Sequence, residues 1–304
     1  MNKYIIFATL LLITIFMVSC TAEVPVPEIT EHQPYAARGD DSNIFVGDLS
    51  DLNLINEEST LPTSFPVYVN KYPVDQGGPI YDIDQPIVDL MTENLSRFLN
   101  ILGVSGYTIE QHEAEIFYRV SYNIGETWYS AGTSDVSIIT KEYGIVDDMI
   151  NGTLLNNNLI QAALAYLNIE NPQIAPFWEY GGDGYNYKIT EATGDLMESI
   201  LGNSFLHVIA VYHPDADGAL IKIIKADISE LASNDEVVPY EEAREYIQDK
   251  YGVAQIGAEI YYNFWVEIGY LIPCYKFFVE EGTTGAGENI YSVIEIPMVT
   301  DRGN

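Results

Sequence analysis

The sequence has few basic residues: 13 Lys and Arg stand against 45 Asp and Glu, which gives a formal net charge of −32. A nucleic acid would meet charge of its own sign over most of such a protein, and the sequence lacks the basic stripe that binds phosphates. We therefore exclude nucleic acid as a partner. Apolar residues are abundant at 47% of the chain, which is enough for a sizeable core and argues against global disorder.

The only long apolar run lies at the amino terminus. Lys3 is followed by Tyr4–Val18, a stretch of 15 residues that is too short to cross a bilayer comfortably. A basic start, a short apolar core and a small residue before a cleavage point are typical of a secretory signal, and Ser19 is such a residue. We therefore predict a signal peptide over residues 1–19, with Cys20 directly after it.

The end of this segment, Met17, Val18, Ser19 and Cys20, resembles the lipobox of bacterial lipoproteins, although Met17 is less usual there than Leu. The resemblance implies that the Cys20 thiol carries a diacylglyceryl group and becomes the first residue after cleavage. It also implies an extracytoplasmic protein that is lipid-anchored to a bacterial membrane. The alternative is a plain signal peptide or anchor helix with an incidental cysteine.

The chain has one other cysteine, Cys274. With Cys20 lipidated, no intramolecular disulfide can form, so the fold must be held by its core. Cys274 lies in a strongly apolar stretch, and we expect a small buried residue there rather than a reactive thiol.

Residues 20–66 differ in composition from the rest of the chain. They are rich in proline and acidic residues, contain Arg38 as the single basic residue, and show little periodicity. We therefore expect an acidic flexible tether over residues 20–66 that holds the globular part away from the lipid surface.

The remaining chain alternates helical and strand patterns. Apolar spacing of three and four residues predicts helices over 84–102, 159–167, 190–201 and 239–251. Strands are expected over 114–122, 127–130, 136–140, 206–212, 220–226, 259–267, 271–280 and 290–298.

These elements predict an α+β fold, in which antiparallel sheets are each covered by helices. A helix followed by two or three antiparallel strands recurs near 84–140, 190–226 and 239–298, which suggests repeated units. We expect a first α+β domain over 67–188 and a second over 189–304.

The last unit combines a helix that opens at Val238–Ala243, strand starts at Glu259 and Ile290, and the stretch Leu-Ile-Pro-Cys-Tyr-Lys-Phe from Leu271 to Phe277. It resembles the PepSY-type module and the similar domains of YycH-like and YycI-like extracytoplasmic regulators. The resemblance implies an inhibitory or regulatory binding module at the cell surface, with no catalytic residue.

Catalytic motifs give no independent support for an enzyme. None of the four histidines has the spacing of a local zinc motif, and neither Cys-x-x-Cys nor Gly-x-Ser-x-Gly is present. His112 with Glu113 and Glu115 could ligate a metal, but we favour a solvated polar loop at these residues. We predict no metal site and no cofactor and favour a non-enzymatic protein, with an envelope hydrolase as a remaining alternative.

Aromatic residues supply the other candidate site. Trp178, Tyr180, Tyr185 and Tyr187 surround a flexible acidic turn, and a second cluster surrounds Trp128. Aromatic faces beside polar groups suit a glycan, whereas half-buried strand positions suit the same residues for structural reasons. The sequence thus predicts a surface-anchored binding or regulatory lipoprotein with an envelope protein as its first expected partner. A cell-wall glycan, bound at the clusters around Trp178 and Trp128, is the alternative.

Overall fold

The computed structural model describes residues 44–46, 48–49, 52, 54–55, 61–71, 85–113, 118–141, 144–177, 185–213, 218–251, 255–265 and 270–299. These residues form an α+β fold built on two antiparallel sheets, which confirms the predicted fold class. None of the helices among them is long and apolar enough to cross a membrane.

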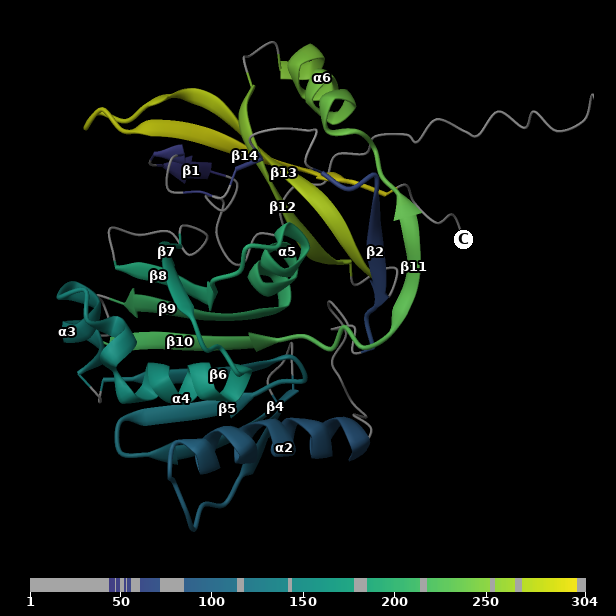
Figure 1. Cartoon of the computed structure of the whole chain (residues 1–304). Coiled ribbons are helices and arrows are strands. Elements are labelled where there is room, and N and C mark those ends of the chain that lie inside the picture. Colours follow the sequence, from purple (N-terminus) through teal and green to yellow (C-terminus); the bar gives the residue numbers. More distant parts are fainter. Residues whose placement is uncertain are drawn as a thin grey trace, which may run out of the picture.

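The larger sheet has eight strands (Figure 1). In spatial order they are β3 (Glu110–Glu113), β4 (Tyr118–Ile124), β5 (Thr127–Ala131), β6 (Asp135–Thr140), β10 (Gly218–Lys225), β9 (Leu206–His213), β8 (Asn186–Glu191) and β7 (Pro172–Pro176). Every pairing between neighbours is antiparallel.

One face of this sheet is covered by the helices α2 (Gln85–Ile101) and α4 (Asn158–Leu167). The apolar residues of α2 recur every three or four positions, so one side of the helix is buried from Val88 to Leu99. The short helix α3 (Ile145–Ile150) and a 3₁₀ turn (Leu154–Asn156) complete the same core.

The second sheet has the order β1 (Ile44–Val46), β14 (Asn289–Pro297), β13 (Tyr270–Thr283), β2 (Ser64–Val69) and β11 (Leu231–Glu236), with β12 (Gln255–Trp265) also paired to β13. Helix α6 (Tyr240–Tyr251) packs on this sheet, where Tyr240 lies against Tyr275 and Phe277. Helix α5 (Leu196–Phe205) contacts both β9 and β12, so it joins the two sheets (Figure 1).

The two sheets divide the chain differently from the expected domains. Strands β2 and β11 pair directly, and the whole eight-stranded sheet is inserted between them in the sequence. The expected boundary between residues 188 and 189 therefore falls inside β8. The expected second repeat, α5 with β9 and β10, does not form its own sheet, because β10 pairs with β6.

The expected tether over 20–66 is wrong at its C-terminal end. Strand β1 pairs with β14, and β2 begins at Ser64. Phe45 is 5% exposed because its ring stacks on Tyr291, at 5.7 Å between centroids, and meets the edge of Phe278 at 5.6 Å. A few isolated apolar residues thus dock this segment, and such sparse residues leave no periodic pattern in the sequence.

The predicted start of the third helix at Thr190 is also wrong. Thr190 lies in β8, where it is buried, and α5 begins five residues later at its N-cap, Asp195. The Asp195 side chain accepts a hydrogen bond of 2.9 Å from the backbone N–H of Glu198, which is the standard capping contact. The helix continues past Gly202 because Phe205 is fully buried in the core beside the second sheet.

Cys274 lies in β13 and is 1% exposed, which confirms the expectation of a buried residue. Burial raises the pKa of its thiol well above the usual value, and the nearby Glu295 carboxylate raises it further. The thiol therefore stays protonated, as expected of an inert core cysteine.

Candidate functional site

The face of the eight-stranded sheet opposite α2 and α4 carries the candidate site, and we call it the open face. Side chains alternate between the two faces along each strand. The open face includes Glu110 of β3, Arg119, Ser121 and Asn123 of β4, Trp128 and Ser130 of β5, Asp135, Ser137 and Ile139 of β6, Leu220, Lys222 and Ile224 of β10, His207, Ile209 and Val211 of β9, and Asn186, Lys188 and Thr190 of β8.

The open face is accessible over β5, β6 and β10, whereas Ile209 and Val211 of β9 are buried beside Phe177. Ile139 lies in the middle of the sheet and is nevertheless 48% exposed, while Trp128, Ser137, Leu220 and Lys222 are half-buried. An exposed apolar residue on a central strand, next to a tryptophan, differs from the fully packed opposite face. Such a surface is a candidate for binding.

Strand register places the side chains of the open face in rows. One row is Ser121, Ser130, Ser137, Lys222, Ile209 and Lys188, and the next is Asn123, Trp128, Ile139, Leu220, Val211 and Asn186. An apolar row that starts at a tryptophan therefore runs beside a row of hydroxyls and ammonium groups.

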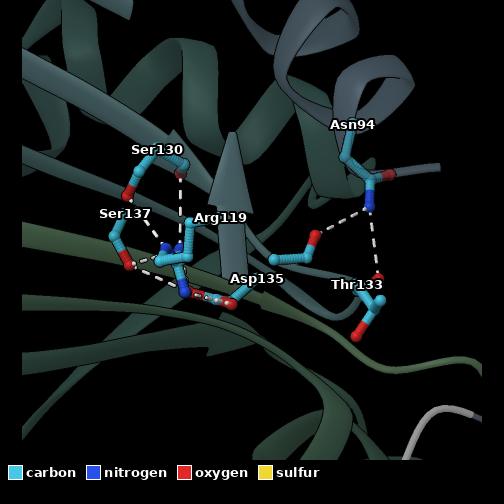
Figure 2. Close-up of polar contacts among 7 residues, drawn as sticks. Asn94, Arg119, Ser130, Thr133, Asp135 and Ser137 are labelled. Carbon is cyan, nitrogen blue, oxygen red and sulfur yellow. Dashed lines mark hydrogen bonds and ion pairs between the residues drawn. The ribbon is translucent and has the colours of Figure 1, made fainter. Parts of the chain in front are cut away.

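A bidentate ion pair lies at one end of the open face (Figure 2). The guanidinium of Arg119 donates to both carboxylate oxygens of Asp135, at 3.0 Å from Nη1 and 2.7 Å from Nη2. Its Nε donates to Ser130 Oγ at 3.1 Å, and Ser137 Oγ donates to Asp135 Oδ2 at 2.8 Å. This fork geometry fixes both side chains.

The ion pair sets the protonation state of Asp135. Burial alone would raise the pKa of this carboxyl, but the charges of Arg119 and Lys222 and the hydrogen bonds from Arg119 and Ser137 outweigh burial. The pKa of Asp135 therefore lies below its usual value, and the group is a carboxylate at neutral pH. A carboxylate held in this way is a structural group rather than a proton donor.

The tight turn beside Asp135 depends on a glycine. A Cβ on Gly132 would lie 2.6 Å from Asp135 Oδ1 and 3.3 Å from Arg119 Nη1, so a side chain there would displace the ion pair. The amide of Asn94 in α2 donates to the carbonyls of Gly132 and Thr133, at 3.4 and 3.2 Å, and ties the turn to the helix (Figure 2).

The charge of the open face is opposite in sign to that of the whole chain. Its residues include three cations, Arg119, Lys222 and Lys188, and two carboxylates, Asp135 and Glu110. Arg119 neutralises Asp135, and Lys222 and Lys188 lie on the two strands that flank Ile209 in the same row. These five charged side chains thus have a formal net charge of +1, in a chain of −32.

Some buried polar atoms of the open face lack a hydrogen-bond partner within the described structure. They include His207 Nδ1, on a side chain that is 7% exposed, and Ser121 Oγ, on a side chain that is fully buried. Buried polar atoms in native proteins nearly always find a partner, which can be a water or a ligand.

His207 is held in its neutral form. Burial lowers the pKa of the imidazole well below its usual value, and the charges of Lys188 and Lys222 lower it further. A backbone hydrogen bond with Gly202 raises the pKa, but it does not offset these effects. Because the ring is neutral and Nδ1 is its unpaired atom, Nδ1 is a hydrogen-bond acceptor.

This neutral histidine predicts a specific pH dependence. The unfolded chain binds a proton on His207 below about pH 6.5 and the folded chain does not, so folding stability contributed by this site is lost as the pH falls. The slope is about 1.4 kcal/mol per pH unit. In urea titrations, wild type should therefore lose about 1 kcal/mol more than His207→Gln between pH 7 and 5.5. Carboxylates titrate equally in both proteins, so identical pH profiles would contradict the assignment.

The structure separates the aromatic residues predicted for a glycan site. Trp128 lies on the open face, whereas Tyr187 lies on the opposite face, where its hydroxyl donates to the Met149 carbonyl at 3.2 Å. Tyr185 directly precedes β8 and is 42% exposed. Trp178 and Tyr180 lie outside the described residues. Trp128 and Tyr187 therefore cannot contact the same ligand ring.

Two neighbours of Trp128, Tyr122 and Tyr129, are structural. Tyr129 is fully buried and stacks on Tyr122, at 6.2 Å between ring centroids, under α2. Cys20 and Glu115 lie outside the described residues, as do the side chains of His112 and Glu113. Within the described parts of the chain, no three His, Cys, Asp or Glu residues gather closely enough to hold a metal ion.

Comparison with known proteins adds little to this geometry. No protein-family model and no curated protein matches the chain. Among solved structures, the chain is similar to an uncharacterised protein from Eubacterium rectale, with 7% identity over 77% of this chain and 83% of that one. The TM-score is 0.38, and a likeness of this size carries no argument about function.

Proposed function

We propose that the protein is a bacterial envelope lipoprotein, anchored through Cys20, that binds a partner without changing it chemically. The open face is the observation that carries the binding role: a rigid sheet presents Trp128 and Ile139 beside a polar row. Asp135 is paired with Arg119 in a bidentate contact, so this carboxylate supports the structure of the sheet rather than donating a proton.

Two classes of partner fit the proposal. The segment from Val238 to Ile294 resembles PepSY-type modules. This resemblance favours an envelope protein as the partner, bound in a regulatory complex. Trp128 on the open face favours a glycan, because an aromatic face beside hydroxyl and amide groups suits a sugar ring. An envelope hydrolase is the alternative, and an activity screen with and without divalent metals tests it.

The anchor is tested by replacing Cys20. The Cys20→Ser variant cannot be acylated, so we expect it either to be cleaved and released from the membrane or to remain unprocessed, and in both cases to incorporate no palmitate analogue. Each acyl methylene that is buried in the membrane contributes about 0.8 kcal/mol to binding, and the variant lacks this contribution. Thr21→Ala is the matched control and should stay anchored. A cleaved Cys20→Ser protein that remains in the membrane fraction would contradict the proposal.

A further inference from the structure

We propose that the side chains of Lys276 and Asn263 become joined by an amide bond, with Glu295 carrying a proton during the reaction. The three residues lie on neighbouring strands of the second sheet: Asn263 on β12, Lys276 on β13 and Glu295 on β14. Such a bond is independent of the lipid anchor and of the open face.

Lys276 and Glu295 form an unusual pair of buried charged residues. They are 5% and 4% exposed, and no other Lys, Arg, Asp or Glu is buried among the residues that the structure describes. The register of β13 with β14 places them directly opposite each other, on the same face of the sheet. Apolar replacement of a buried ion pair is often neutral or stabilising, so stability alone explains this pair poorly. Its burial favours a chemical role.

Glu295 also reaches Asn263. The Asn263 carboxamide donates a hydrogen bond from Nδ2 to Glu295 Oε2 at 3.0 Å. Strand β13 pairs with β12 along one edge and with β14 along the other, so this contact crosses the strand that carries Lys276. Glu295 is therefore both the cross-strand neighbour of the lysine and the hydrogen-bond partner of the carboxamide.

The amine of Lys276 leans toward Asn263. Register places Lys276 opposite Glu259, yet its Nζ lies 4.3 Å from the centroid of the Tyr261 ring, which is two residues nearer to Asn263 along β12. Tyr261 and Asn263 lie on the same face of β12, about 7 Å apart. The flexible four-carbon stem of the lysine can cover that remaining separation.

The reaction exchanges one amide nitrogen for another. Glu295 takes a proton from the ammonium of Lys276, and the neutral amine attacks Cγ of Asn263. The bond from Cγ to Nζ forms and the bond from Cγ to Nδ2 breaks. Nδ2 leaves with a second proton from Nζ and with the proton held by Glu295, so the leaving group is ammonium. No electrons are gained or lost, and Glu295 ends as the carboxylate it was at the start.

The new bond closes a covalent loop from residue 263 to residue 276, across the pairing of β12 with β13. Closing such a loop limits the unfolded chain in the same way as a disulfide. Cys274 is a free cysteine, so the amide bond gives this sheet a covalent link that its cysteine does not provide.

Mass spectrometry of the full-length Cys20→Ser chain tests the proposal, because that chain carries no lipid to alter its mass. The amide bond lowers the mass by one ammonia, about 17 Da. It also blocks cleavage by trypsin after Lys276. We therefore expect one peptide over 251–302 that lacks an ammonia, in place of separate peptides over 251–276 and 277–302. This first measurement needs no substitution at the site.

Three variants assign the roles. Lys276→Met removes the amine, and its 251–302 peptide should have the full mass. Glu295→Gln keeps the shape of the proton carrier and removes its function, so it should restore both the ammonia and the cleavage after Lys276. Lys250→Arg is the control, because Lys250 is exposed on α6 and arginine keeps the cleavage site. It should leave the loss of ammonia unchanged.

Several outcomes would overturn the proposal. Cleavage after Lys276 without a loss of mass would leave only a buried ion pair. A loss of ammonia that persists in Lys276→Met would assign it to a cyclised asparagine, which loses the same mass. A loss that persists in Glu295→Gln would remove Glu295 from the reaction. None of these outcomes affects the anchor, which depends on the membrane retention of the acylated chain.

Discussion

Replacing Asp135 with leucine is expected to lower the free energy of unfolding by about 3 kcal/mol, because Arg119 would keep its charge without a partner. The side chains of Arg119 and Asp135 are only 18% and 15% exposed, so water cannot readily replace the lost carboxylate. The hydrogen bond from Ser137 is lost as well. Urea denaturation measures the change.

The double variant Arg119→Met with Asp135→Leu separates the unpaired charge from the loss of the pair itself. Apolar replacement of both partners is often close to neutral, so most of the lost stability should return. Asp249→Leu, at an exposed position of α6, is the control and should change stability by less than about 0.5 kcal/mol. A single variant as stable as the double variant would show that the ion pair contributes little.

Replacing Phe45 with alanine should cost about 3 kcal/mol, at the lower end of the range for large-to-small substitutions of buried aromatic residues. Phe45 fills the space between Phe278 and Tyr291, and nothing on the short strand β1 can replace its ring. Thermal or urea unfolding of the full chain measures the loss.

The neighbours of Phe45 provide a matched control. Ile44 and Val46 lie on the same strand, point away from the sheet core and are each 44% exposed. Alanine at either position should change stability by less than about 0.5 kcal/mol. Equal effects at all three positions would mean that β1 is not docked through Phe45, and the tether would then extend at least to residue 46.

The sequence predicts an element well where its residues repeat with a period. Helix α2 was expected over 84–102 and is found at Gln85–Ile101, and β13 was expected over 271–280 and is found at Tyr270–Thr283. The apolar residues that define these elements also pack them, so pattern and structure agree. The missed strands lack that signal. The strand β11 is polar throughout except at its first two residues, and β7 contains two prolines at a sheet edge.

The candidate site could not be predicted from the sequence in the same way. Ser137 and Lys222 are neighbours only because β10 pairs with β6, and the sequence between those strands gives no hint of that pairing. One signal was available in retrospect: Lys222 interrupts the apolar strand from Leu220 to Ile224. Its alternation with buried residues indicates a strand with one solvent-facing side. The sequence alone could not show which face of the sheet each predicted aromatic residue would occupy, because the face depends on the strand register.

The direct pairing of β2 with β11 also determines the order in which the chain can fold. The eight-stranded sheet is complete once residues up to Lys225 are available, and its pairings are comparatively local. In the other sheet, the pairings of β1 with β14 and of β2 with β11 and β13 close loops of more than a hundred residues. Such contacts form slowly, because loop-closure entropy must be overcome before the pairing stabilises it. During synthesis from the amino terminus, β1 and β2 therefore stay unpaired until their partner strands have been made. The described segment nearest the amino terminus is thus the last to pair.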